Sequence, residues 1–251
     1  MDRMIVRFNG YELTEKFALL DDLSRPLPEF RHESVDVPGM DGTDFDAQTV
    51  GPRSCSFSLA ALGESEEHTQ TLWRELAAAL AVRTPSPLTF SDERDEFGTQ
   101  LVRYAVPSGV PDLDEWRRAG RALLTFEQDD PYLYGRSRSV MLESMADTRI
   151  EVGGNVPAHP RLVTKVDQFS EGVPFSLLDA AGNVIKTVAA WYSAGTARTV
   201  VIDEEKLSVT ITPSGSSDTG ITLGSRFFQL SGTCYVRAGG SPTLNWRERW
   251  I

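Results

Sequence analysis

The feature that most constrains the fold of this chain is a tight turn followed by an alternating run, both within its first sixty residues. Residues 37–42 read Val-Pro-Gly-Met-Asp-Gly, and residues 53–59 read Arg-Ser-Cys-Ser-Phe-Ser-Leu. Proline and glycine favour turns, and alternation of polar and apolar side chains is typical of a strand with one buried face. We therefore expect a long protruding hairpin from about Val35 to Leu59, with Asp41 and Gly42 in its loop. A β scaffold carrying such a hairpin suits an assembly component better than an enzyme.

Residues 1–140 are expected to form an α+β domain with antiparallel sheets and one helix. The helix is predicted over Glu64–Val82, where Leu72, Leu76 and Leu80 recur every four residues and so share one face. It ends before the Pro-Ser-Pro at 85–87, because proline cannot continue a helix. Strands bounded by Gly, Pro or Asp turn signals are predicted at Met4–Phe8, Ser34–Val37, Arg53–Leu59, Leu88–Phe90, Gln100–Pro107 and Arg121–Gln128.

Residues 152–251 are expected to form a second domain, a β-sandwich, after a Gly/Pro-rich junction at 153–160. Helical periodicity of useful length is absent from this part of the sequence, while short alternating runs and turn signals succeed one another. Asp203–Lys206 is predicted as a hairpin tip and Gly182-Asn183 as a tight turn. The predicted strands are Arg161–Val166, Pro174–Leu178, Val184–Val188, Thr199–Ile202, Leu207–Ile211, Phe227–Leu230, Thr233–Val236 and Leu244–Trp250. The fold class of the whole chain is therefore mainly β.

The acidic side chains are concentrated in the first part of the chain. Residues 1–150 carry 27 acidic and 16 basic side chains, a net formal charge of −11, whereas residues 151–251 carry nine of each. A protein that reads nucleic acid needs basic clusters that neutralise phosphates, so this distribution argues against sequence-specific binding of nucleic acid. The sequence also lacks an apolar run of about 18 residues and a signal peptide. We therefore expect that the protein is made in the cytoplasm and does not insert into a membrane.

Signals for catalysis, cofactors and metals are weak. The sequence has no Gly-x-Ser-x-Gly elbow, His-Glu-x-x-His helix, P-loop or dinucleotide fingerprint, so neither an enzyme nor a cofactor is predicted. Asp41, Asp44 and Asp46 do not have the spacing of a calcium loop, and we interpret them as solvated turn residues. The adjacent acids at 203–205 do not resemble the carboxylates that a glycosidase places across a cleft. Cys55, Cys234 and the three separated histidines suggest no metal site, and both thiols are expected to be free and buried.

Several short motifs, in this order and with these spacings, resemble the distal tail protein family (Dit) of phages with long non-contractile tails. These motifs are Phe8-Asn9-Gly10, Arg25-Pro26, the turn at 37–42, Gly51-Pro52-Arg53, the Pro-Leu-Thr-Phe strand at Pro87–Phe90 after the helix, and Asp130–Gly135. The similarity is strongest over residues 1–136. Beyond them, the start at Pro160 and the final strands to Trp250 look like the galectin-like sandwich of that family.

The resemblance implies a structural role in a virion. In this family six N-terminal domains close into a ring that continues the tail tube, joins it to the tail-tip proteins and surrounds the DNA channel. The implied partners are other copies of the chain, the tail tube protein, the tail-tip protein and the tape measure protein, and the implied location is the distal end of the tail. Contacts between subunits are then expected at the hairpin loop, for which the candidate residues are Pro38, Gly39, Asp41, Gly42 and Phe45.

An alternative function is carbohydrate binding during adsorption to the host, because the second domain is rich in aromatic residues. Trp191 and Tyr192 are the candidates for stacking on a sugar ring. Alternation places Trp246, Glu248 and Trp250 on one face of the last strand, and the charge of Glu248 predicts that this face is partly exposed. An enzyme acting on cell-wall polymers is the weakest of the three hypotheses.

Overall fold

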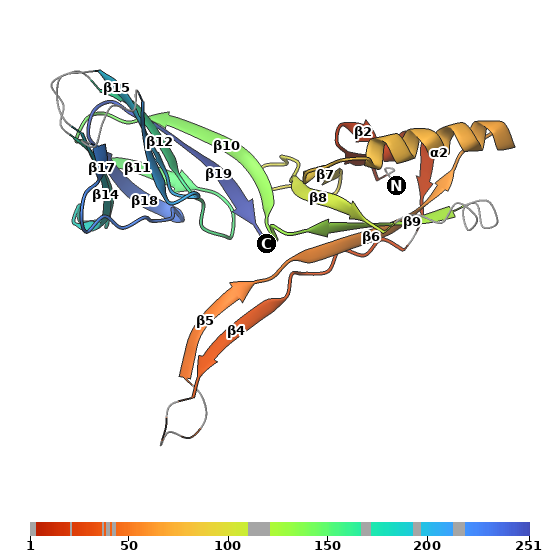
Figure 1. The fold of residues 1–251 in the computed structure, drawn as a ribbon, viewed down its shortest axis with the longest axis horizontal. Helices are drawn as coiled ribbons and strands as arrows, with labels where there is room; N and C mark the ends of the chain where they lie inside the picture. Colours follow the sequence, from red (N-terminus) through yellow and green to blue (C-terminus); the bar gives the residue numbers. More distant parts are fainter. Residues whose placement is uncertain are drawn as a thin grey trace. The chain divides into compact units, whose positions relative to one another are not determined.

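The computed structural model describes residues 4–20, 22–36, 38, 41, 44–109, 121–166, 172–192, 197–212 and 219–251 (Figure 1). The chain divides into two compact units, one comprising residues 1–133 with Ile251 and the other residues 134–250. Both are mainly β, as predicted from the sequence, and their strands pair antiparallel. Within the described residues, no helix is long and apolar enough to span a membrane.

The first unit is built on a seven-stranded sheet with the order β2-β1-β7-β8-β9-β6-β3. Its pairings are antiparallel, and the longest joins β6 to β9 from Arg53↔Gln128 to Ala60↔Arg121. Short turn-separated segments of alternating polarity form this sheet because each can bury one face and solvate the other. The strands are β1 (Val6–Phe8), β2 (Tyr11–Glu12), β3 (Phe17–Leu19), β6 (Arg53–Ala61), β7 (Ser86–Phe90), β8 (Arg103–Ser108) and β9 (Arg121–Gln128).

Four phenylalanine rings form the centre of the core of this unit. The ring of Phe57 stacks on that of Phe126 with centroids 5.6 Å apart and meets Phe90 edge to face at 5.8 Å. Phe8 contacts Phe126 at 4.9 Å, and all four residues are fully buried. Phe57 lies in the alternating run of residues 53–59, where the predicted strand is confirmed as part of β6 with Cys55, Phe57 and Leu59 buried.

The predicted helix is α2 (Glu66–Leu80), slightly shorter than expected. It begins after Ser65, whose hydroxyl accepts a hydrogen bond from the backbone N–H of His68 at 3.1 Å, as an N-cap does. Leu72 and Leu76 are buried against the sheet, as the spacing predicted. A second, four-residue helix, α1 (Leu13–Lys16), was not predicted, because it is too short to show helical periodicity.

The hairpin is present, but its arms differ from the predicted ones. It pairs β4 (Phe30–Val35) with β5 (Asp44–Val50) in a separate two-stranded sheet, drawn in Figure 1 outside the seven-stranded sheet. The prediction of arms running from Val35 to Leu59 was therefore wrong. Gly51-Pro52 ends the returning arm, because proline cannot donate to the ladder, and the next strand, β6, has a buried face and joins the main sheet instead.

The second unit is a sandwich of two five-stranded sheets. Their orders are β10-β19-β12-β15-β16 and β11-β18-β13-β14-β17, with one apolar core that includes Phe175 and Phe228 in ring contact at 4.8 Å. The strands of the first sheet are β10 (Leu133–Met141), β12 (Arg161–Val166), β15 (Arg198–Asp203), β16 (Ser208–Thr212) and β19 (Thr243–Trp250). The strands of the second sheet are β11 (Thr148–Val152), β13 (Gly172–Leu178), β14 (Val184–Tyr192), β17 (Thr219–Ile221) and β18 (Gly232–Ala238).

Two parts of the second unit differ from the sequence prediction. The predicted bounds assign residues 134–140 to the first domain and leave residues 141–151 between the domains. In the structure these residues belong to the second unit and contain most of β10 and β11. Residues 227–230 do not form a strand, and only Leu230 makes a bridge, to Ala158. The two predicted turns are confirmed: β15 and β16 pair across the tip at 204–207, and β13 and β14 pair across the turn containing Gly182.

Glu248 corrects the prediction for the last strand. Its side chain is 1% exposed and Trp246 is 8% exposed, so both lie inside the sandwich, whereas Trp250 at the end of the same face is partly exposed. Arg138 of β10 donates to Glu248 Oε1 at 2.9 Å and neutralises the buried carboxylate. Room for the carboxylate depends on Gly153, where an added Cβ would lie only 2.9 Å from Glu248 Oε1. A charged residue at position 248 therefore does not indicate an exposed position, because its carboxylate is paired with an arginine.

Candidate functional site

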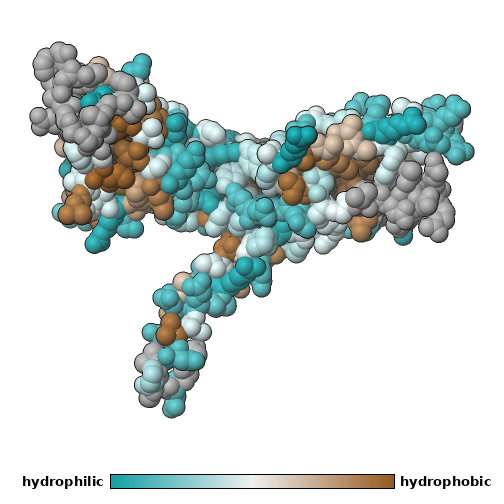
Figure 2. Space-filling model, viewed as in Figure 1, coloured by the Kyte–Doolittle hydropathy of each residue, from teal (hydrophilic) through white to brown (hydrophobic). Residues whose placement is uncertain are grey.

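The β4–β5 hairpin leaves its side chains largely uncovered. All six residues of β4 are exposed, and Phe30, Val35 and Phe45 are 43%, 53% and 60% exposed. Figure 2 shows apolar side chains on the surface of the hairpin. An isolated two-stranded hairpin is marginally stable in water, and neither strand pairs with a third strand within the described residues. The hairpin therefore presents apolar surface that another protein surface could bury.

The predicted loop contacts are only partly described by the structure. Pro38 and Asp41 are exposed at the end of the hairpin, and Phe45 projects from β5, where its ring lies 6.0 Å from that of His32. Gly39 and Gly42 lie outside the described residues. Among the described residues, no three His, Cys, Asp or Glu side chains are grouped as metal ligands would be. The described part of the hairpin thus offers a few exposed apolar side chains for contact with another surface.

The two aromatic candidates for sugar stacking lie on opposite faces of β14. Trp191 is 41% exposed, and its side chain covers Gly220 of the paired strand β17, where an added Cβ would lie 2.8 Å from Trp191 Nε1. Tyr192 is 2% exposed and belongs to the core. Adjacent residues of a strand point to opposite faces, so the pair cannot form one platform. Tyr192 is not available for stacking, which corrects that part of the prediction.

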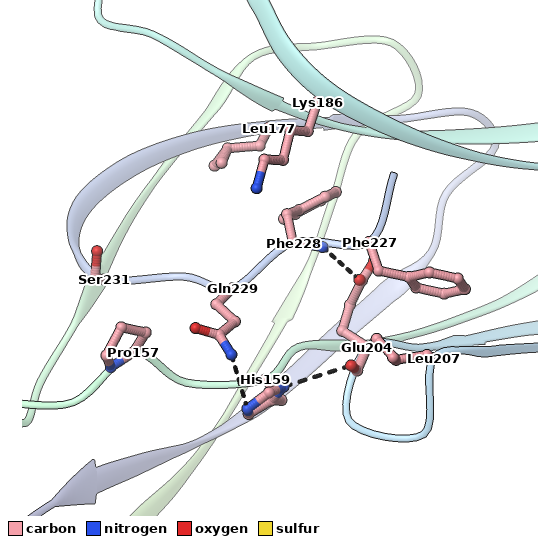
Figure 3. A pocket seen from close by; sticks show the side chains of 10 residues that line it. All are labelled: Pro157, His159, Leu177, Lys186, Glu204, Leu207, Phe227, Phe228, Gln229 and Ser231. Atoms are coloured by element: carbon pink, nitrogen blue, oxygen red, sulfur yellow. Dashed lines mark hydrogen bonds between the residues drawn. The ribbon is translucent and has the colours of Figure 1, made fainter. Parts of the chain in front are cut away.

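A cavity of about 430 Å³ lies in the second unit around a buried carboxyl group, that of Glu204 (Figure 3). Glu204 follows β15 at the hairpin tip and is 1% exposed. Its Oε2 accepts a hydrogen bond from the backbone N–H of Phe228 at 2.7 Å, while Oε1 has no hydrogen-bond partner among the described residues. Burial raises the pKa of Glu204 to about 7, because a carboxylate is poorly solvated there.

His159 and Gln229 form a second polar wall of this cavity. Gln229 Nε2 lies 3.2 Å from His159 Nε2, and His159 Nδ1 lies 3.4 Å from the backbone oxygen of Glu204. One neutral tautomer fits both contacts: Nδ1–H donates to the carbonyl, and Nε2 accepts from the amide. Burial lowers the pKa of His159, in agreement with a neutral ring.

This site was not predicted, because no local motif marks it. Residues 203–206 were predicted as a hairpin tip, and Phe228, whose N–H binds Glu204 Oε2, lies 24 positions away in the sequence. Cys55 and Cys234 behave as predicted: both are free and buried, and burial raises the pKa of each thiol.

The buried carboxyl predicts a pH dependence of stability. The pKa of Glu204 is higher in the folded state (about 7) than its ordinary value of 4.5, so the protonated form favours folding. That stability is fully present below pH 4.5 and is lost as the pH rises through 7, by up to about 3 kcal/mol. Relative to the wild-type chain, Glu204→Gln should therefore gain unfolding free energy between pH 5 and 8 in urea titrations. Glu205→Gln, at the exposed neighbour, is the matched control, and equal curves for both variants would contradict this assignment.

Comparison with known proteins places the fold. Residues 7–128 match the family model of the phage tail protein RIFT-related domain. No curated protein matches the chain. The solved structure of the Dit protein of phage SPP1, described as a paradigm of the hub adsorption apparatus in phages that infect Gram-positive bacteria, is 18% identical. It aligns over 100% of both chains with a TM-score of 0.74.

Two structures of the baseplate of phage P2 in its activated conformation also align. The structure with calcium is 10% identical over 99% of this chain and 98% of that chain, with a TM-score of 0.57. The structure with strontium is 10% identical over 98% and 97%, with a TM-score of 0.56. At these identities the likeness concerns the fold, whereas the family match rests on the sequence of residues 7–128. Residues 7–128, just under half of the chain, are thus similar to the phage tail protein RIFT-related domain, and the fold of the chain is similar to that of the SPP1 Dit protein.

Proposed function

We propose that six copies of this chain form the hub at the distal end of a long non-contractile phage tail. The ring joins the tail tube to the tail-tip proteins and surrounds the channel through which DNA leaves. The family of residues 7–128 and the fold shared with a hub protein of another phage support this role. The role is structural rather than enzymatic, and the neighbouring parts are the tail tube, tail-tip and tape measure proteins.

The observation that carries this proposal is the uncovered hairpin of the first unit. A ring of identical subunits requires a heterologous contact, in which one surface of each copy binds a different surface of the next. The hairpin supplies the first surface, because its strands are exposed along their length and carry Phe30, Val35 and Phe45. Burying those side chains on a neighbouring copy would remove apolar surface from water and order the hairpin.

The distribution of charge is compatible with a DNA channel. The net charge of −11 over residues 1–150 belongs almost entirely to the unit that would form the ring. A negatively charged wall repels phosphates, and DNA would therefore pass without binding to it. The second unit is nearly neutral.

The purified full-length chain is expected to form closed rings. Light scattering should give about six times the mass of one chain, or twice that if two rings stack, and negative-stain images should show annular particles. A chain that stays monomeric at high concentration, shows no rings and does not bind tail tube or tail-tip protein would overturn the proposal.

A further inference from the structure

The β4–β5 hairpin is joined to the main sheet of the first unit by a segment without a backbone ladder. On the sheet side of this segment, Ser24 and Ser56 exchange backbone hydrogen bonds of 2.8 and 3.0 Å. On the hairpin side, the N–H of Gly51 donates to the oxygen of Glu29 at 2.7 Å. Between these contacts the two arms, both described by the structure, share no backbone hydrogen bond. The outgoing arm, residues 25–28, contains two prolines, which have no N–H to donate. Backbone pairing therefore does not fix the direction in which the hairpin leaves the sheet.

The side chain of Arg25 holds the outgoing arm instead. Its Nη1 and Nη2 donate to the two carboxylate oxygens of Asp92 at 3.0 and 2.6 Å. Nη1 also lies 3.0 Å from Glu93 Oε1, and the guanidinium carbon lies 4.9 Å from the centroid of the Phe90 ring. The side chain of Arg25 is only 23% exposed. A bidentate pair within a network of charges holds one geometry, unlike a single ion pair at the surface. We call these contacts the Arg25 clamp.

The groups that hold Arg25 are themselves fixed in the body of the first unit. Phe90 ends β7 and is fully buried in the phenylalanine cluster. Arg103 of β8 is 2% exposed, forms an ion pair with Glu93, and has its guanidinium carbon 5.1 Å from the centroid of the Phe90 ring. The Arg25 clamp therefore ties the base of the hairpin to β7 and β8, and 67 positions separate Arg25 from Asp92 in the sequence.

The returning arm is held differently, at Arg53. This residue begins β6, and β6 pairs with β9 from Arg53↔Gln128 onward. Arg53 Nε also donates to Gln128 Oε1 at 3.1 Å, and Gln128 is 2% exposed. Since the returning arm has a backbone ladder behind it, the side chain whose loss should free the hairpin is Arg25.

We propose that Arg25 positions the hairpin for assembly, because its clamp on Phe90, Asp92 and Glu93 fixes the direction in which the hairpin leaves the first unit. A hairpin that points in several directions is ready to bind a neighbouring copy only part of the time, and the apparent affinity falls by that fraction. The consequence for assembly rests on the proposed hub function, whereas the direction of the hairpin can be measured within one chain.

The first test measures that direction by double electron-electron resonance in the full-length chain. Phe30→Ser and Phe45→Ser remove the rings proposed to bind a neighbouring copy, and an excess of unlabelled chain restricts the measurement to distances within one chain. Spin labels are attached at Asp46→Cys in β5 and Leu123→Cys in β9, and the two native thiols are buried. Arg25→Gln should broaden and shift the distribution of distances, because the outgoing arm is then held by neither a ladder nor an ion pair.

The matched control is Arg7→Gln, which removes the same charge from the same unit. Arg7 also donates two hydrogen bonds to one carboxylate, that of Glu12, but this pair joins β1 to β2. Its distribution should equal that of the parent chain. Arg25→Lys keeps the charge without the planar fork and should give an intermediate width. An unchanged distribution in Arg25→Gln, or equal broadening in Arg7→Gln, would overturn the proposal.

The second test follows ring formation with both phenylalanines of the hairpin in place. Light scattering should show that Arg25→Gln needs a concentration about tenfold higher than the wild-type chain to form rings, because a charged hydrogen-bonded pair no longer favours the competent direction. Arg7→Gln should assemble as the wild-type chain does. Normal assembly of Arg25→Gln despite a broadened distribution would refute the role in assembly. If the wild-type chain forms no rings, the hub function fails, while the distance measurement still decides whether Arg25 sets the direction of the hairpin.

Discussion

The double substitution Phe30→Ser and Phe45→Ser is expected to leave this chain monomeric under conditions where the wild-type chain forms rings. Each phenylalanine is about half exposed in the single chain, so both can bury further surface on a neighbouring copy. Burying one such side chain contributes about 1.5–3 kcal/mol. Because each ring has only about half of its surface left to bury, losing two from every interface should weaken each contact by about 1.5–3 kcal/mol, which is roughly ten- to a hundredfold in dissociation constant. Light scattering over a concentration series measures this change directly.

The control separates assembly from folding. Met141 is 73% exposed on β10 of the second unit, and Met141→Ser should form rings as the wild-type chain does. All three chains should unfold at similar urea concentrations when monomeric, because substitutions at exposed positions usually change the unfolding free energy by less than about 0.5 kcal/mol. Rings of normal size from the double variant would show that the hairpin does not hold the subunits together.

Phe57→Ala should destabilise the first unit by about 4 kcal/mol, the range measured for buried phenylalanines. The ring of Phe57 is fully buried between those of Phe90 and Phe126, so its removal loses apolar burial and leaves a cavity at the centre of the sheet. Native-state hydrogen exchange of the backbone amides in β6 and β9 reports the unfolding free energy of this unit alone.

The matched control for this core substitution is Leu123→Ala on β9. Leu123 is 54% exposed and points away from the phenylalanine cluster, so its truncation should change exchange in β6 and β9 only slightly. A loss of less than about 1 kcal/mol in Phe57→Ala would mean that the cluster is not the main source of stability of the unit.

Periodicity was sufficient to predict most of the strands and the main helix. The buried face of β6 was readable because Cys55, Phe57 and Leu59 alternate with serines, and the face of α2 because leucines recur every four residues. These patterns arise from the repeat of the backbone itself, so a single sequence displays them. The family resemblance rests on the same local motifs, and the match over residues 7–128 agrees with it.

Periodicity failed where the environment of a side chain depends on distant residues. Alternation correctly put Trp246 and Glu248 on one face of β19. The burial of Glu248 there depends on its ion pair with Arg138, which lies 110 positions earlier in the sequence. In the same way, the predicted strand Val184–Val188 stopped short of Trp191 and Tyr192, which lie on β14, and the packing of the sandwich decided which of the two is covered.

The candidate site separates the two kinds of information most clearly. The amino-acid sequence alone determined that residues 203–206 turn between two strands, because that turn depends on local residues. Only the tertiary structure decided that Glu204 is buried, with its carboxylate bound to the N–H of Phe228, because residues distant in the sequence surround it. Burial and the pKa that follows from it are properties of the assembled neighbourhood, and no stretch of sequence contains them by itself.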